Sequence, residues 1–140
     1  MYYTFHKSER LCSKKLIAQL FVKGNRGFSW FPFRFTWVPA VLDAQVPAQV
    51  LFVVSKRNFP KATDRNTIKR QLRECYRLAK PTLYESLGSQ KQIALSIMFS
   101  APKSIPFKEL SEIFATCIKQ LCYDLEKNHP GTIYPSHSDL

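Results

Sequence analysis

Apolar residues recur along the chain with two spacings, one typical of helices and one typical of strands. Between positions 14 and 23 they lie three and four residues apart, which is the spacing of one helix face. Ser13 precedes this stretch and Gly24 follows it, as an N-cap residue and a C-terminal glycine would. The pattern therefore predicts a short amphipathic helix over residues 14–23.

Residues 28–38 alternate in the manner of a strand, and one face of that strand is aromatic. That face holds Phe31, Phe33, Phe35 and Trp37. We expect Phe31, Phe33 and Trp37 to lie in the core. Pro32, on the other face, has no N–H to donate, which favours an edge strand. Residues 50–55 and 93–99 predict two further strands, the first covered on both faces, and residues 38–50 predict a loop.

Two longer helices complete the pattern. One of about 15 residues begins at Thr63 or Asp64 as N-cap and ends before Pro81. The other begins near Pro106 and carries an apolar stripe: Phe107, Leu110, Ile113, Phe114, Cys117, Ile118, Leu121 and Leu125. The order helix, two strands, helix, strand, helix indicates an α+β fold with helices packed on a small sheet.

Length and composition narrow the classes of protein that remain. A chain of 140 residues, 45% of them hydrophobic, is long enough for one domain with its own core. We expect that domain over residues 1–127 and a disordered tail over residues 128–140. No apolar run reaches the roughly 18 residues of a membrane helix, and no signal peptide is recognisable. The four cysteines form no C-x-x-C pair, so we expect reduced core thiols in a cytoplasmic protein, with a zinc site as the alternative.

The net charge of +11 is concentrated in the first 80 residues. Residues 54–80 hold nine basic residues against two acidic ones, and residues 1–37 hold seven against one. Residues 81–140 hold five against six. A concentrated positive field is typical of a protein that binds a polyanion, most often nucleic acid. A solvated basic surface is the alternative, although solubility does not require the charges to cluster.

The second predicted helix separates charge from apolar surface. At about 100° per residue, its basic side holds Arg65, Asn66, Lys69, Arg70, Arg73, Arg77 and Lys80. The apolar side holds Ile68, Leu72, Cys75 and Ala79, with Tyr76 at its border and Leu78 widening it. Like charges one turn apart repel each other, and a polyphosphate partner would turn that cost into affinity. An ordinary amphipathic helix with a basic face is the alternative.

Residues 55–77 resemble the signature of the bacterial ribonuclease P protein subunit. That family carries a V-[SA]-K-[KR] strand end, a short loop and an R-N-R-x-K-R-x-x-R-E helix. The matching helix positions here are Arg65, Asn66, Lys69, Arg70, Arg73 and Glu74. The chain departs from the pattern at Thr67, where the family has arginine, and at Pro60, where small or basic residues are common. The resemblance extends upstream through Arg10 and Leu11 to the first predicted helix.

This resemblance implies a fold and a function. The fold is ribosomal protein S5 domain 2-like, with the order α-β-β-β-α-β-α and a left-handed βαβ crossover, so one more strand would lie within residues 28–54. The function is that of the non-catalytic protein subunit of an endoribonuclease. A large RNA subunit, using Mg²⁺, removes the 5′ leader of precursor tRNA, and one protein binds each RNA. No metal bound by the protein is expected.

The resemblance also implies two binding surfaces. One binds the RNA subunit through Arg65, Asn66, Lys69, Arg70, Arg73, Lys61 and Arg77. The other binds the precursor tRNA leader between the first helix and the sheet, through Ile17, Phe21, Phe35, Lys56 and Arg57. Aromatic rings stack on unpaired bases and basic groups meet phosphates, which suits sequence-tolerant binding of a single strand.

The residues themselves do not favour catalysis by the protein. No histidine lies between Lys7 and Asn128, and no carboxylate pair, metal-ligand cluster or Gly-rich phosphate loop is recognisable. A stand-alone RNA-binding module, such as a ribosomal protein or RNA chaperone, would explain the charge but not the R-N-x-x-K-R-x-x-R-E pattern. A DNA-binding regulator would need a helix and a tight turn before the basic helix, and a basic loop stands there instead.

Overall fold

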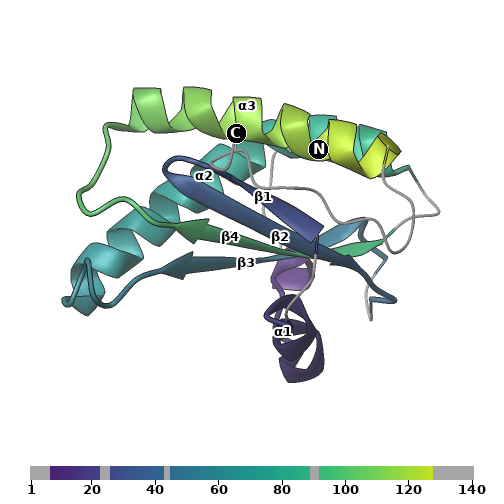
Figure 1. Cartoon of the computed structure of the whole chain (residues 1–140), viewed down its shortest axis with the longest axis horizontal. Coiled ribbons are helices and arrows are strands. Elements are labelled where there is room, and N and C mark those ends of the chain that lie inside the picture. The colour runs from purple at the N-terminus through teal and green to yellow at the C-terminus, as the bar shows by residue number, and fades with distance from the viewer. Residues whose placement is uncertain (1–6, 23–25, 43–44, 89–91, 128–140) are drawn as a thin grey trace.

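A four-stranded sheet lies between helices on both of its faces (Figure 1). The computed structural model describes residues 7–22, 26–42, 45–88 and 92–127. Its elements in chain order are η1 (Lys7–Glu9), α1 (Lys14–Leu20), β1 (Arg26–Trp30), β2 (Phe33–Pro39), β3 (Ala48–Val54), α2 (Ala62–Leu87), β4 (Ile93–Phe99) and α3 (Phe107–Lys127). The predicted α+β class and the order α-β-β-β-α-β-α are confirmed. The predicted tail, Gly24 and the three histidines lie outside the described residues.

The last strand of the chain lies in the middle of the sheet, whose order is β1-β2-β4-β3. β4 runs antiparallel to β2 and parallel to β3, and α2 connects the two parallel strands. In register, Val54 at the end of β3 lies beside Phe99 at the end of β4. The chain therefore leaves both strands at the same end of the sheet, and the basic segment that follows β3 begins at that end.

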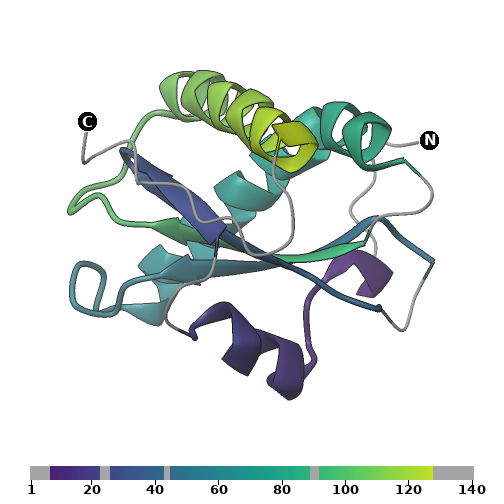
Figure 2. The same cartoon turned by 45° about the vertical axis from the view of Figure 1, so that its right-hand side comes forward.

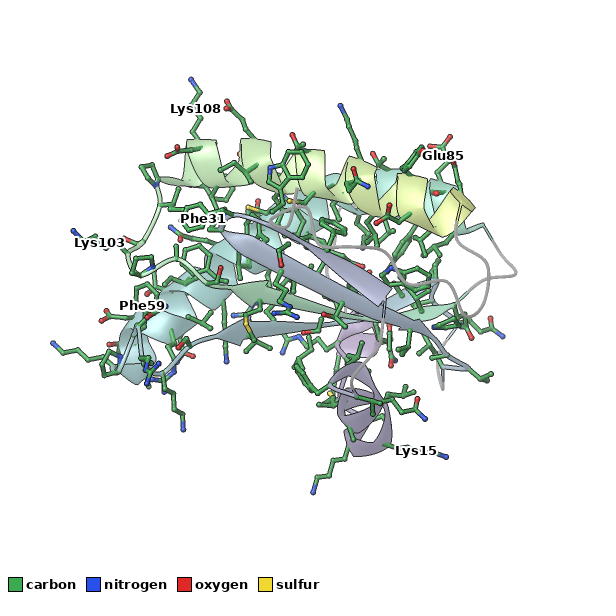
Figure 3. All side chains as sticks on the ribbon, viewed as in Figure 1. Lys15, Phe31, Phe59, Glu85, Lys103 and Lys108 are labelled. Carbon is green, nitrogen blue, oxygen red and sulfur yellow. The ribbon has the colours of Figure 1, made fainter. Side chains whose placement is uncertain are left out.

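The aromatic segment 28–38 forms a hairpin rather than one strand, so the single-strand prediction is wrong. β1 and β2 pair antiparallel, and the turn between them contains Phe31 and Pro32. Pro32 lies in this turn and not in an edge strand, because its fixed φ suits a turn and its carbonyl accepts the Ser100 N–H at 2.8 Å. Phe31 is 67% exposed, so it is not a core residue (Figure 3). The hairpin supplies the extra strand that the resemblance implied.

The main core lies between the sheet and the two long helices. Phe33, Phe35 and Trp37 of β2 are buried there, and the Phe114 ring of α3 lies 5.3 Å from Phe33 and 5.8 Å from Phe35, centroid to centroid. The apolar stripe predicted for α3 is buried, except that Ile113 is half-buried and Phe107 is exposed at the first turn. These contacts fix α2 and α3 on one face of the sheet (Figure 2).

α2 is longer than predicted, with 26 residues and Pro81 inside it. The prediction that the helix ends before Pro81 is wrong because Leu83 and Leu87 continue the buried stripe and outweigh the hydrogen bond that a proline removes. The helix ends at Gly88, whose φ is 69°, a value that favours glycine. At the other end the N-cap residue is Lys61, without a side-chain cap bond, and not Thr63 or Asp64.

α1 covers part of the opposite face of the sheet (Figures 1 and 2). Ser13 is its N-cap, as predicted, and the Ser13 Oγ accepts the Leu16 N–H at 3.3 Å. The helix is shorter than predicted and ends at Leu20. Leu20 packs with Val38 of β2 and Ala94 of β4 in a second, smaller apolar cluster. Because these strand residues lie at one end of their ladders, the other end of this face extends beyond α1.

The four cysteines are free thiols, as predicted, and two of them, Cys75 and Cys117, are buried in the core. Cys12 is exposed and Cys122 is half-buried, so the prediction of a core position is wrong for Cys12. Within the described parts of the chain, no helix is both long enough and apolar enough to cross a membrane.

Candidate RNA interface

The first half of α2 presents the predicted basic residues on one side of the helix. We define the basic helix face as Asn66, Lys69, Arg70 and Arg73; the first and third are exposed, and the other two are half-buried. The opposite side of the same turns is the buried stripe that begins with Ile68. Burial of that stripe fixes the rotation of the helix, so the guanidinium and ammonium groups point away from the core. The structure thus brings these four predicted residues together.

Arg65 has a second role in addition to its charge. Its Nη1 donates to the carbonyl oxygens of Phe59 at 2.8 Å and of Pro60 at 2.9 Å. These bonds attach the loop before the helix to the first turn of the helix. Arg65 therefore positions the loop, and its remaining N–H groups are those available to a partner.

The basic loop, residues 55–61, is held by its own hydrogen bonds. The Ser55 Oγ accepts the Arg57 N–H at 3.1 Å, and the Asn58 side-chain amide donates to the Ala101 carbonyl at 3.3 Å. The Phe59 ring is buried beside the first turn of α2 (Figure 3). Lys56 and Arg57, both predicted to bind the leader, are exposed on this loop, as is Lys61 at its end. The loop thus holds its cations at defined positions on the surface.

The basic side of α2 is shorter than the angular pattern predicted. Arg77 donates from Nε to Glu74 at 2.9 Å; this bond raises the pKa of Arg77 and lowers the pKa of Glu74, so part of the Arg77 charge is neutralised locally. Lys80 is 2% exposed and paired with Glu9, so its predicted place on the basic side is wrong. Leu78, predicted to be apolar surface facing the core, is 48% exposed.

Two neighbouring cations act on Arg73. Its pKa is lowered, first by burial and then by the charges of Arg10 and Arg70. Mutual repulsion of this kind raises the affinity of a site for an anion. Thr67, where the resembling pattern has arginine, donates its hydroxyl to the Thr63 carbonyl at 2.9 Å within the helix, so this position adds no cation.

The second predicted surface is only partly assembled. Ile17 of α1 is half-buried against the smaller apolar cluster, and Phe21, which caps the end of α1, is 56% exposed. Phe35, however, is 0% exposed and lies on the opposite face of the sheet, stacked on Phe28 at 5.1 Å. The prediction that the Phe35 ring contacts the leader is therefore contradicted by its burial in the main core.

Strand register identifies the residues that occupy the α1 side instead. Arg34 of β2 lies beside Met98 of β4, which lies beside Val53 of β3. Arg34 is exposed, and Met98 and Val53 are half-buried. We call these three residues the open sheet face. The row lies close to the end of β3, from which Lys56 and Arg57 follow.

The open sheet face was not predicted from the sequence, although part of the signal for it was present. Alternation placed Arg34 opposite the aromatic residues of β2. The sequence does not indicate which of the two faces of the sheet α1 covers, because that depends on contacts between distant segments.

The described residues contain no group of three or more His, Cys, Asp and Glu side chains able to hold a metal ion. The site thus consists of cations, one exposed aromatic ring and apolar strand residues. This combination can bind a phosphate backbone and unpaired bases.

Comparisons with known proteins agree on one family. The family model described as Ribonuclease P matches residues 5–122. The ribonuclease P protein component of Chlorobium phaeobacteroides is 38% identical over 117 residues, covering 76% of this chain and 80% of that protein. The protein component of Chlorobaculum tepidum is 34% identical over 96 residues, covering 63% of this chain and 62% of that protein. Among solved structures, the RNase P protein from Thermotoga maritima has a TM-score of 0.63 at 20% identity, covering 80% of this chain and 96% of that chain.

Proposed function

The chain belongs to the ribonuclease P protein family, and we propose that it serves that enzyme through two separate binding surfaces. Proteins of this family are components of an RNA–protein endoribonuclease and are partners of the ribonuclease P RNA. One surface, the basic helix face together with Lys61, binds the RNA subunit. The other, on the α1 side of the sheet, binds the 5′ leader of precursor tRNA.

The convergence of cations on α2 is the observation that supports the first surface. Arg70 is exposed and Arg73 is half-buried one turn of helix away, on a helix fixed from below by its buried stripe. Arginine presents a planar fork that binds phosphate oxygens in pairs. A rigid row of such groups is suited to bind the backbone of a large folded RNA. Cations on a mobile segment of the protein would have to become ordered on binding, and that ordering costs free energy.

The open sheet face supports the second surface. It offers Arg34 for a phosphate and Met98 and Val53 as an apolar floor for bases. Phe21 lies exposed at the end of α1, which covers the neighbouring part of the same face, and Lys56 and Arg57 stand at the strand end. Contacts of these kinds tolerate any base sequence, which a subunit that receives many different leaders requires.

The chemistry, in this proposal, belongs to the RNA subunit, which uses Mg²⁺. The described residues do not form a metal-binding group, and we assign no chemical step to a metal held by the protein. The protein contributes binding energy and orientation, and one copy acts with each RNA.

Reconstitution tests the proposal directly. Purified protein is added to its cognate ribonuclease P RNA at low Mg²⁺, and cleavage of precursor tRNA is measured with mature tRNA as competitor. We expect the protein to stimulate cleavage and to increase the preference for precursor over mature tRNA. Cleavage by rigorously RNA-free protein, or a complete lack of stimulation, would overturn the proposal.

A further inference from the structure

A buried ion pair joins the N-terminal segment to the second half of α2. The Lys80 ammonium lies 2.9 Å from the Glu9 carboxylate, and both side chains are 2% exposed. Tyr84, one turn further along α2, donates its hydroxyl to the same carboxylate, and its ring lies 5.4 Å from the Lys80 ammonium. Glu9 is therefore held from one side by two residues of one helix.

The residues around Glu9 are attached to the edge strand as well. Arg10 forms a parallel bridge with Val50 of β3, and the Leu11 N–H donates to the Val50 carbonyl at 3.0 Å. The Gln49 side-chain amide donates to the Ser8 carbonyl at 3.0 Å. Residues 8–11 are thus fixed to β3 by their backbone and to α2 by the Glu9 side chain.

Arg10 lies within this attached segment, and its side chain is exposed. The pKa of Arg73 is lowered first by burial and then by the charges of Arg10 and Arg70. Lys80 lies seven residues, about two helical turns, after Arg73, so the ion pair attaches residues 8–11 on the side of α2 that carries Arg73.

Buried ion pairs contribute little net stability compared with apolar residues of the same size, and in some proteins their role is to fix the relative position of two segments. Here such a pair joins η1 to α2. We propose that Arg10 is part of the surface that binds the RNA subunit, and that the Glu9–Lys80 pair is a positioning device that holds Arg10 on the side of α2 that carries Arg73. This inference rests on the proposed function, since it takes the RNA subunit as the partner.

Arg10→Gln tests the contact, with Lys108→Gln as the matched control. Lys108 is an exposed cation on the outer side of α3 (Figure 3). Affinity for the RNA subunit is measured over a series of salt concentrations. We expect Arg10→Gln to lower affinity about tenfold or more and to reduce the slope of log affinity against log salt by about 1. Lys108→Gln should change neither quantity, and Arg10→Lys should restore the slope but only part of the affinity.

The double variant Glu9→Gln with Lys80→Met tests the positioning role, because it removes both charges together and leaves neither one buried alone. Folding is checked by circular dichroism and thermal unfolding. We expect the affinity to fall as far as it does in Arg10→Gln, and Arg10→Gln added to the double variant should cost nothing further. Should the double variant fail to fold, Glu9→Asp, which shortens the carboxylate arm, is measured in its place with the same expectation.

The outcomes separate this inference from the proposed function. Wild-type affinity and slope in Arg10→Gln, with weak binding in Arg70→Ala/Arg73→Ala, would overturn the inference and leave the proposed function standing. Wild-type affinity in Arg70→Ala/Arg73→Ala would overturn the proposed surface itself. Full affinity in the folded Glu9/Lys80 variant would overturn the positioning role.

Discussion

Gly27 of β1 lies against the backbone of Phe35 in β2 with no space for a side chain. A Cβ atom at Gly27 would come within 2.2 Å of the Phe35 carbonyl oxygen and 3.2 Å of the Thr36 Cα. Because both neighbours are backbone atoms of a strand that is paired on its two sides, neither can move without disturbing the sheet. The hairpin therefore depends on glycine at this position.

Gly27→Ala should destabilise the protein by about 1–3 kcal/mol, the usual cost of forcing extra volume into a packed region. Ser29→Ala, at the next position on the same face of β1, is the control and should change stability by less than about 0.5 kcal/mol. Denaturant unfolding of both variants gives the comparison. Equal stabilities for the two would contradict the close approach.

Phe21 and Phe35 should separate binding from stability. Phe35 is fully buried, so Phe35→Ala should cost about 3–5 kcal/mol of unfolding free energy. Phe21→Ala removes an exposed ring and should leave stability nearly unchanged, while lowering affinity for precursor tRNA by about 1–3 kcal/mol if one base stacks there. Thermal unfolding and precursor tRNA affinity, with mature tRNA as reference, check both. A stable Phe35→Ala protein with impaired leader binding would reverse the assignment.

The two proposed surfaces should fail in different ways. Arg70→Ala with Arg73→Ala should weaken assembly with the RNA subunit by a hundredfold or more, at roughly 1.5–3 kcal/mol per charged hydrogen bond, and higher protein concentration should restore activity. Lys56→Ala with Arg57→Ala should leave assembly closer to wild type and abolish the preference for precursor over mature tRNA.

Holoenzyme affinity and the affinities for both tRNAs are measured for the two double variants. Proportional loss of assembly and leader preference in both would indicate one diffuse basic patch rather than two surfaces.

Thiol reactivity should follow burial. Burial raises the pKa values of Cys75 and Cys117 to about 12, so both thiols remain protonated between pH 7 and 9, and only the thiolate reacts. Cys12 is exposed. Alkylation of the native protein at pH 8, followed by mass spectrometry, should label Cys12 first and label Cys75 and Cys117 only after denaturant is added. Rapid native labelling of Cys117 would show that the helix α3 opens from the core.

The elements predicted most accurately from the sequence are those that a single periodicity determines. The strand over Ile93–Phe99 and the start of α3 after Pro106 agree with the structure, because each is a regular pattern between clear end signals. The hairpin was missed although a signal for it exists. The buried aromatic Phe28 is at an even position and Phe33 is at an odd one, yet both belong to the main core. That change of phase marks the turn between them.

The parts that could not be predicted depend on contacts between distant segments. Lys80 has the right helical angle for the basic side, but it is buried in an ion pair with Glu9, which is 71 residues away in the sequence. Pro81 is a sound stop signal by local rules, and burial of Leu83 overrides it. The same holds for the candidate site. The local motif on α2 was predicted from the sequence, and the open sheet face was not.

The central place of β4 has a consequence for the order in which the protein is made. Ribosomes release a chain from its N-terminus at about 5–20 residues per second, so β2 and β3 are complete before the strand that pairs with both of them. The basic loop and the basic helix face also precede β4. During synthesis the nascent chain therefore carries most of its positive charge before it has a closed sheet, and it does so next to the RNA of the ribosome. The sheet can be completed only after β4, which ends at Phe99, has been released.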